Sequence, residues 1–268
     1  MARSLWSGSL SFGLVNVPIA IYSGVVDQDV HFRQLHAKDH MPVETHRFCK
    51  EEDVEVPYEQ IANGYDLDGK QVVLTDEELA AAAPEKTRTI DIEAFVDVAD
   101  VDPIHLDHPY ILMPLGDAQG TLRAYRLLLE VMDRTERAAL GRFVLRTKEY
   151  LALIRARDKR LVLTTMLFHD EVRPTKDIPK ETKKSQQPAK KEVEQAVALI
   201  EALGCEWDPS RYADEYQKRL KRILQQKAKG KTVEVPEPEK EPSPVPDLMA
   251  ALEQTLAEVK RGERRPVG

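Results

Sequence analysis

The stretch that decides the fold is Arg142–Met166, which reads RFVLRTKEYLALIRARDKRLVLTTM. Apolar and polar residues alternate along most of it, which predicts β-strands because successive strand side chains point to opposite faces. Phe143 falls on one face, whereas Arg142 and Lys148 fall on the other. The polar segment 157–160, Arg-Asp-Lys-Arg, separates two apolar runs and predicts a hairpin turn. We therefore expect a sheet that packs on one side and carries cations on the other.

Outward from this stretch, the chain alternates between strand-like and helix-like segments. Strands are expected at 4–22 with a turn or bend near Gly13, and at 30–36, 65–74, 89–98 and 108–115. The 65–74 segment is expected to be a hairpin, because Asp68-Gly69 is a typical two-residue turn. Capping residues or apolar residues at helical spacing predict helices at 75–83, 119–134, 192–205, 210–229 and 247–261.

The composition is that of a soluble, rather polar protein. The chain has 268 residues, of which 42% are hydrophobic and 32% charged, enough for one large or two modest domains. Its two cysteines, Cys49 and Cys205, predict no disulfide framework and favour a reducing compartment. The first residues lack the apolar core of a signal peptide, and no apolar run approaches the roughly 20 residues of a membrane span. We therefore expect a cytoplasmic protein that does not contact a membrane.

The charges are distributed unevenly. The formal net charge is −7, which alone disfavours nucleic acid as a partner. Residues 51–110 contain 17 acidic and three basic side chains, whereas residues 121–160 contain 11 basic and five acidic ones. An acidic half and a basic centre predict a positive field focused on one surface. The alternative interpretation is a solvated sheet face balanced by nearby acids such as Glu149 and Asp158.

No segment carries the signature of a catalytic site. The sequence has no Gly-x-Ser-x-Gly elbow, zinc-protease helix or dinucleotide-binding fingerprint. Residues 64–70 fit the spacing GxxxxGK, but Gln71 stands where the magnesium-binding hydroxyl belongs, so a hairpin turn is the better interpretation. We expect no enzyme activity, no cofactor and no metal. Four potential zinc ligands are close in sequence but lack the paired spacing of a structural zinc site: His36, His40, His46 and Cys49.

If nucleic acid is the partner, the residues favour contact with the backbone of a duplex. Aromatic side chains on which single strands stack are sparse in the basic stretch, where only Phe143 and Tyr150 occur. Lys and Arg contacts to phosphates displace condensed counterions, so binding would depend strongly on salt and show no sequence preference. About six such contacts would give a log–log salt slope of around −5. Single-stranded DNA and RNA are the other partners that the composition allows.

Several blocks of the chain, in order and with ordinary spacing, together resemble bacterial Ku. The blocks are ARSLWSGSLSFGLVNVPIAIYS at 2–23, FRQLH at 32–36, VEVPYEQIANGY at 54–65, VVLTDEEL at 72–79 and GRFVLRTKEYLALIRARDKRLVLTTMLFHDEVRP at 141–174. DLMAALEQTL at 247–256, after a proline-rich linker, is similar to the end of many bacterial Ku chains. The resemblance covers residues 2 to about 180 and is far more specific than a short motif.

The resemblance implies an α+β, mainly β fold: a Ku-type β-barrel core with an extended DNA-encircling bridge, then a C-terminal helical arm and a short tail helix. It implies a homodimer whose bridges close a ring, through which double-stranded DNA ends thread with no sequence specificity. The family acts in non-homologous end joining, where Ku recruits and stimulates a multifunctional ATP-dependent DNA ligase and has no established catalytic role. The expected location is the cytoplasm, in association with the nucleoid.

Four regions are expected along the chain. Residues 1–185 form the Ku core with barrel and bridge, and residues 186–230 form the C-terminal helical region. Residues 231–246 are a Pro/Glu-rich linker, because their composition cannot form a compact core. Residues 247–268 form a short amphipathic helix with a basic tail.

Given the resemblance, the basic stretch becomes a candidate inner wall of the ring. The expected phosphate contacts are Arg146, Lys148, Arg155, Arg157, Lys159 and Arg160. Weaker candidates, because Glu130 or Asp133 could neutralise them, are Arg142, Arg123 and Arg126. The last helix offers an apolar stripe as a ligase-docking face, with packing on the protein's own body as the alternative: Leu248, Met249, Leu252 and Leu256.

Two other functions fit parts of the pattern. A protein-interaction scaffold would present the basic face to an acidic protein. A metal-dependent nuclease would use the acidic region with magnesium, but the alternation at 89–98 spreads its carboxylates along a strand instead of gathering them at one site.

Overall fold

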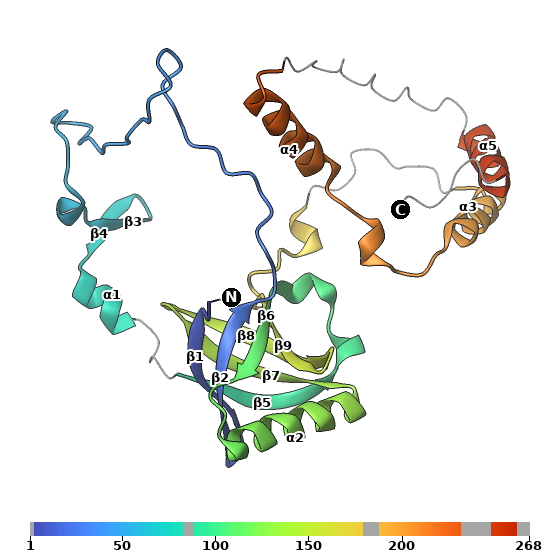
Figure 1. Ribbon diagram of the computed structural model, residues 1–268, viewed down its shortest axis with the longest axis horizontal. Helices are drawn as coiled ribbons and strands as arrows, with labels where there is room; N and C mark the ends of the chain where they lie inside the picture. Colours follow the sequence, from blue (N-terminus) through green and yellow to red (C-terminus); the bar gives the residue numbers. More distant parts are fainter. Residues whose placement is uncertain (1–2, 83–87, 179–187, 232–247, 262–268) are drawn as a thin grey trace. The chain divides into compact units, whose positions relative to one another are not determined.

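The computed structural model describes residues 3–82, 88–178, 188–231 and 248–261 (Figure 1). The chain divides into two compact units. The first, here the barrel unit, comprises Met1–Asp27 and Arg33–Ile178; the second, here the helical unit, comprises Gln28–Phe32 and Pro179–Gly268. Among the described helices, none is long and apolar enough to span a membrane.

The described residues form β-strands and α-helices in the order that the sequence predicts, with one exception given below. The strands are β1 (Trp6–Phe12), β2 (Val15–Ser23), β3 (Asn63–Leu67), β4 (Lys70–Leu74), β5 (Thr89–Asp97), β6 (Leu106–Pro114), β7 (Arg137–Leu145), β8 (Lys148–Arg157) and β9 (Arg160–Met166). The helices are α1 (Asp76–Ala82), α2 (Gln119–Thr135), α3 (Lys190–Leu203), α4 (Glu215–Ala228) and α5 (Leu248–Lys260).

Seven strands close into a barrel in the order β1-β2-β6-β9-β8-β7-β5 (Figure 1). Neighbouring strands are antiparallel except β1 and β5, whose parallel pairing of Ser9–Ser11 with Thr89–Asp91 closes the barrel. Closure removes the exposed edges that an open sheet would have. The barrel confirms the expected mainly β fold with a barrel core.

Side chains that alternate along the strands fill the barrel interior, as their periodicity predicts. Phe143 on β7, Ile154 on β8 and Leu163 on β9 are buried in one apolar cluster. Gly141 lies two residues before Phe143 on the same face, where a Cβ atom would come within 2.5 Å of the backbone oxygen of Asp91. Strands β5 and β7 therefore approach each other so closely only because this position is glycine.

Helix α2 covers one end of the barrel (Figure 1). Its stripe of Tyr125, Leu128 and Met132 is buried in the same cluster as the barrel interior. The Tyr125 hydroxyl donates to the carbonyl oxygen of Leu112 at 2.8 Å and accepts the N–H of Leu161 at 2.9 Å, so it ties the helix to β6 and β9. We call this end of the barrel the α2 end. It contains the last residues of β1, β5, β6 and β8 and the first residues of β2, β7 and β9.

Tyr125→Phe is expected to destabilise the barrel unit by about 1–3 kcal/mol, because it leaves a buried N–H and a buried carbonyl without this partner. Tyr150→Phe is the matched control, since the Tyr150 hydroxyl makes no hydrogen bond within the described residues. Urea denaturation followed by far-UV circular dichroism measures both. Equal effects of the two substitutions would contradict the bridging role of Tyr125.

Between β2 and β5, the described residues 24–82 and 88 add no strand to the barrel, because β3 and β4 pair only with each other in a separate two-stranded sheet. Their hairpin β3–β4 turns at Asp68-Gly69, as the sequence predicts. Helix α1 follows a capping box: the Thr75 hydroxyl accepts the N–H of Glu78, and the Glu78 carboxylate accepts the N–H of Thr75. The described residues of this segment therefore contribute a hairpin and a helix but no barrel strand.

The strand expected at 30–36 is not formed, apart from an isolated bridge between Leu35 and Pro42. Its alternating apolar residues do not pack on a core: Phe32 is 66% exposed and Leu35 is 48% exposed. Alternation predicts a strand only where a neighbouring strand and an apolar surface are available, and this segment has neither among the described residues.

In the helical unit, α5 packs against α3, and Gln195 Nε2 donates to Glu253 Oε1 at 3.1 Å. Helix α4 begins at Glu215, later than the expected start near 210, because residues 209–211 form a separate 3-10 turn. Asp214 caps α4 by accepting the N–H of Gln217. Most of the expected linker, and Asp247 after it, lie outside the described residues.

Candidate nucleic-acid interface

The basic stretch Arg142–Met166 forms most of three adjacent barrel strands, β7, β8 and β9. The strand register pairs Arg157 with Arg160, which confirms the hairpin turn expected at 157–160. The stretch is barrel wall, whereas the described residues between β2 and β5 contribute no barrel strand. Because β8 has ten residues and a strand rises about 3.3 Å per residue, the cations at its two ends lie roughly 30 Å apart.

At the α2 end, the β8–β9 turn carries Arg157, Lys159 and Arg160. Asp158 and Lys159 have positive φ angles of 48° and 60°, as a two-residue type I′ turn requires. Arg157 and Arg160 are direct cross-strand partners, and like charges in that position are destabilising. Asp158 lies 3.5 Å from Arg157 Nε, whereas Arg160 Nη1 donates to the sulfur of Met113. The turn thus holds three cations beside one carboxylate.

Arg155 lies two residues before Arg157 on β8 and points to the same face. It lines a cavity of about 510 Å³ that also contains Asp97, Asp133 and Glu136. Its Nε is buried and has no hydrogen-bond partner in the part of the chain that the structure describes. A buried guanidinium nitrogen without a partner is costly, and the three carboxylates that line the same cavity balance part of the positive charge of Arg155.

Arg142, in the middle of β7, is neutralised by a neighbouring strand. Its Nε lies 2.9 Å from Oε1 of Glu93 on β5, and the hydrogen bond with Glu93 raises the pKa of the guanidinium. The sequence suggested Glu130 or Asp133 as its partner, but Glu130 pairs with Arg134 on α2 instead. The side chains of Arg142 and Glu93 are 51% and 48% exposed, so this ion pair contributes little to stability. The pair does reduce the net positive charge of the barrel wall formed by β7, β8 and β9.

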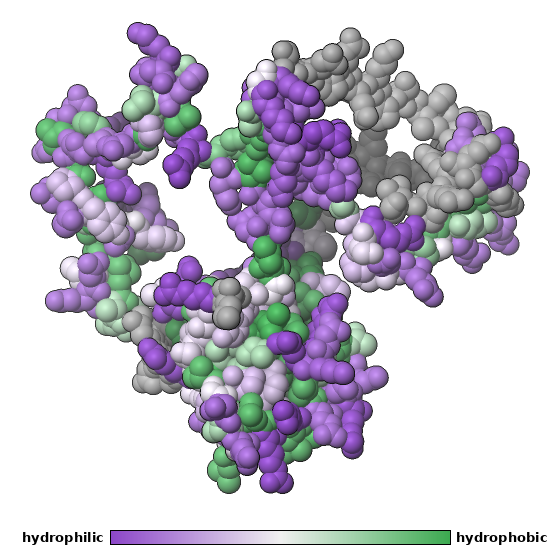
Figure 2. Space-filling view, viewed as in Figure 1, coloured by the Kyte–Doolittle hydropathy of each residue, from purple (hydrophilic) through white to green (hydrophobic). Residues whose placement is uncertain are grey.

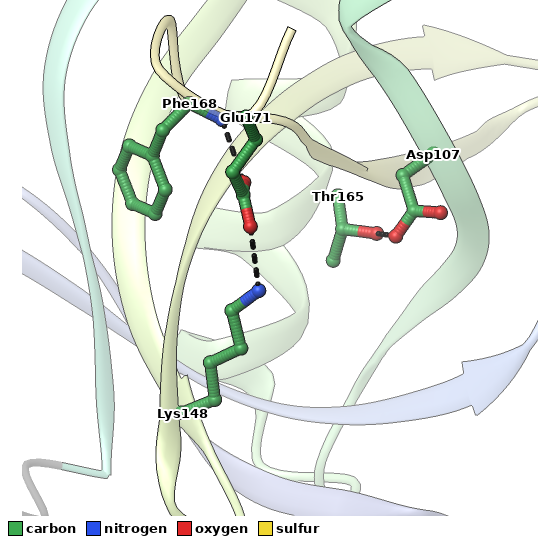
Figure 3. A network of polar contacts seen from close by, with 5 residues as sticks. All are labelled: Asp107, Lys148, Thr165, Phe168 and Glu171. Atoms are coloured by element: carbon green, nitrogen blue, oxygen red, sulfur yellow. Dashed lines mark hydrogen bonds and ion pairs between the residues drawn. The ribbon is translucent and has the colours of Figure 1, made fainter. Parts of the chain in front are cut away.

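Lys148 is neutralised at the opposite end of the barrel (Figure 3). Its Nζ lies 2.9 Å from Oε1 of Glu171, whose other oxygen accepts the N–H of Phe168 at 2.9 Å. The hydrogen bond between them raises the pKa of Lys148 and lowers the pKa of Glu171. In the same view, the Thr165 hydroxyl donates to Asp107 at 3.0 Å. Two carboxylates therefore accompany this end of the wall.

The structure separates the nine residues expected to contact phosphate. Arg146, which has a φ of 63° in the β7–β8 turn, and Lys148 lie at the end opposite α2, and Arg142 lies between the ends. Arg123 and Arg126 are exposed on α2 itself. The six that the fold brings to one end are here called the α2-end cations: Arg123, Arg126, Arg155, Arg157, Lys159 and Arg160.

Arg137, the first residue of β7, belongs to the same end and was not expected there from the sequence. It lines the cavity beside Arg155. The signal that could have found it is the apolar run Ala138–Gly141 directly before Arg142, which is long enough to extend the strand back to Arg137. The expected strand began at Arg142, five residues too late.

The expected ligase-docking residues lie on α5. Leu252 and Leu256 are half-buried, in a helix that packs against α3. The side chains of Leu248 and Met249 lie outside the described part of the chain. Part of the apolar stripe is thus covered within the helical unit.

Two histidines between β2 and β5, His36 and His46, are paired with carboxylates. His36 Nδ1 lies 2.9 Å from Asp39. His46 bonds to Glu55, and this contact raises the pKa of His46. Among the residues that the structure describes, no group of three or more His, Cys, Asp or Glu is placed to hold a metal ion.

Comparison with known proteins places the chain in a family. A family model described as the Ku70/Ku80 beta-barrel domain matches residues 11–195. The non-homologous end joining protein Ku 1 of Geotalea uraniireducens is 39% identical over 262 residues, which cover 97% of this chain and 98% of the relative. The Ku 1 protein of Saccharopolyspora erythraea is 36% identical over 262 residues, 98% of this chain and 80% of the relative. The Mycobacterium tuberculosis Ku protein is 36% identical over 264 residues, 95% of this chain and 94% of the relative. This chain, with its closed barrel and the match over nearly its full length, belongs to the Ku family.

Proposed function

We propose that the chain binds the ends of double-stranded DNA without sequence preference, as a homodimeric ring, in non-homologous end joining. The observation that carries the proposal is the similarity to relatives named for that process over 95–98% of this chain. The closed barrel supports the proposal, and so does the separate β3–β4 sheet between β2 and β5, because the resemblance implies a barrel with an extended bridge.

The α2-end cations are the proposed contacts to the DNA backbone. Phosphate oxygens would supply counter-charge at the β8–β9 turn, where Arg157, Lys159 and Arg160 stand beside the single carboxylate of Asp158. Arg142 and Lys148, which are held by Glu93 and Glu171, become weaker candidates. Backbone contacts of this kind carry no sequence information, in keeping with a protein that accepts any end.

A gel-shift competition tests end binding directly. A labelled linear duplex is bound by the full chain, and the competitor is the same unlabelled sequence as either a linear duplex or a covalently closed circle. The linear competitor is expected to displace the label and the circle is not, because a closed circle offers no end to thread. Equal competition by the two forms would contradict threading, and cleavage of either DNA with magnesium would favour a nuclease.

The two alternative functions have less support. A scaffold that presents its basic face to an acidic protein has no need of DNA ends, so linear and circular competitors would act alike on it. The gel-shift competition therefore separates a scaffold from an end-binding ring. A metal-dependent nuclease needs clustered carboxylates, and on β5 the acids point along an exposed strand face, where Glu93 pairs with Arg142.

We further propose that the C-terminal part recruits an ATP-dependent DNA ligase and that the four regions 1–185, 186–230, 231–246 and 247–268 act as separate parts. Because α5 packs against α3, the ligase would meet the two helices as a pair. Helix α3 adds an exposed apolar stripe of Val193, Val197 and Ile200, which are 46%, 47% and 70% exposed. Such a helix face can dock in a groove of a partner.

Deleting residues 247–268 is expected to leave end binding within about twofold of wild type, because the α2-end cations all lie in the barrel unit. The same deletion is expected to abolish stimulation of the ligase. The measurements are the gel shift above and a nick-sealing or end-joining assay with purified ligase. Retained stimulation would contradict the docking role of the tail helix, and loss of end binding would show that the helix stabilises the barrel unit.

A further inference from the structure

An apolar pocket of about 410 Å³ lies at the α2 end. This volume is within the range of about 300–1,000 Å³ that is typical of small-molecule sites. One wall is the α2 stripe of Ala124, Leu127, Leu128, Val131, Met132 and Thr135. The facing wall is formed near the ends of β1, β2 and β5 by Phe12, Val15, Val17 and Phe95.

The rim of this pocket is unusually apolar for a surface. Leu127 and Val131 are 61% and 48% exposed, and Phe12 is 45% exposed. Phe12 and Phe95 meet edge to face with their ring centroids 5.3 Å apart, which makes a rigid aromatic wall. The Thr135 hydroxyl donates to the carbonyl of Val131, so its donor is already used within α2. Figure 2 shows apolar residues among the charged ones on the surface of the barrel unit. Contiguous exposed apolar patches mark binding sites.

Arg137 is the charged residue in the pocket lining. Its guanidinium forms no ion pair and no side-chain hydrogen bond within the described residues. Asp97 is its cross-strand partner, but the Asp97 carboxylate accepts the N–H of Ala99 at 3.0 Å instead. Arg137 also lines the neighbouring cavity, where Asp133 and Glu136 add negative charge. A guanidinium without a partner favours a ligand with an anionic group. The nearby carboxylates repel negative charge, so they disfavour a ligand that carries more than one.

We propose that this pocket binds an amphipathic monoanion, namely an acyl chain or aromatic group that ends in a single carboxylate. The apolar part lies between the α2 stripe and the Phe12–Phe95 pair, and the carboxylate meets Arg137. The few polar groups among apolar walls are the arrangement expected of a ligand site. None of the α2-end cations belongs to this site, so ligand binding can be tested independently of the proposed DNA binding.

Isothermal titration of the full chain without DNA, with decanoate and with decan-1-ol as probes, tests this proposal. The two probes share an apolar chain and differ in the charged head. Decanoate is expected to bind about tenfold more tightly than decan-1-ol, because a charge-assisted hydrogen bond to Arg137 is available only to the carboxylate.

Three variants locate the site. Arg137→Met is expected to remove the tenfold preference for decanoate while leaving decan-1-ol binding unchanged. Leu127→Gln, at an exposed rim position, and Ala124→Phe, which fills the pocket, are expected to weaken both probes. Arg134→Met is the matched control, because Arg134 lies on the same helix, pairs with Glu130 and does not line the pocket. Thermal unfolding checks that each variant is folded.

Several results would overturn the proposal. One is equal binding of decanoate and decan-1-ol to the wild-type chain, and another is binding that is unaffected by both Leu127→Gln and Ala124→Phe. A third is the absence of binding together with a shift of the Leu127→Gln variant toward monomer in sedimentation, which would identify the pocket as a surface between copies of the chain.

Discussion

Replacing Arg157 and Arg160 together by glutamine is expected to lower the affinity for a linear duplex on the order of 100-fold, about a factor of ten for each phosphate interaction removed. The two side chains are cross-strand partners at the β8–β9 turn, where Asp158 is the carboxylate next to them. The log–log salt slope is expected to become shallower by about 0.9 for each phosphate that is no longer neutralised. Fluorescence anisotropy at several salt concentrations measures the affinity and the slope.

Arg142→Gln combined with Lys148→Gln is the matched control, because it removes the same number of positive charges from the same sheet. Glu93 and Glu171 already neutralise these two cations, so the affinity is expected to fall by less than about threefold. Similar reductions in the two double variants would show that total charge matters and that the α2 end has no special role.

Gly141→Ala is expected to destabilise the barrel unit by about 3 kcal/mol or more, and to reduce the yield of folded protein. The new Cβ atom would lie 2.5 Å from the backbone oxygen of Asp91, far inside normal van der Waals distance, and neither strand can move without disturbing the barrel. Because β7 also carries Arg137 and Arg142, the change would disturb the wall that presents the cations. Thermal and urea unfolding followed by circular dichroism measure the destabilisation.

Gly120→Ala is the control for this substitution, since a Cβ atom there meets no other atom within 4 Å. Gly120 lies in the first turn of α2, where alanine is a better helix former, so stability is expected to be unchanged or to rise by up to about 1 kcal/mol. A smaller destabilisation by Gly141→Ala than by Gly120→Ala would contradict the close approach of β5 and β7.

Local patterns in the sequence predicted most of the barrel strands correctly. The turn at 157–160, the hairpin at Asp68-Gly69 and the capping box at Thr75 all form as their residues indicate. These features depend on residues a few positions apart, which a sequence displays directly. The prediction of a strand at 30–36 was wrong, because alternating residues do not reveal whether a partner strand is present.

The arrangement of the site could not be predicted from the sequence, because it depends on contacts between distant residues. Arg142 meets Glu93 from a strand 49 positions away, and Lys148 meets Glu171 from beyond the end of β9. The six cations expected to contact phosphate most directly look like one basic run in the sequence. The barrel places Arg146 and Lys148 at one end and the remaining four at the other, which is the end that α2, the helix of Arg123 and Arg126, covers.

Encirclement of DNA by the proposed ring is tested most directly by closing the DNA after the protein has bound. The chain is loaded on a linear duplex of several hundred base pairs, the ends are joined by a ligase, and the complex is challenged with about 1 M salt, which screens phosphate contacts. A threaded ring is expected to stay on the closed circle through the challenge and to leave when a restriction enzyme reopens it. Release from the closed circle as fast as from the linear duplex would contradict encirclement.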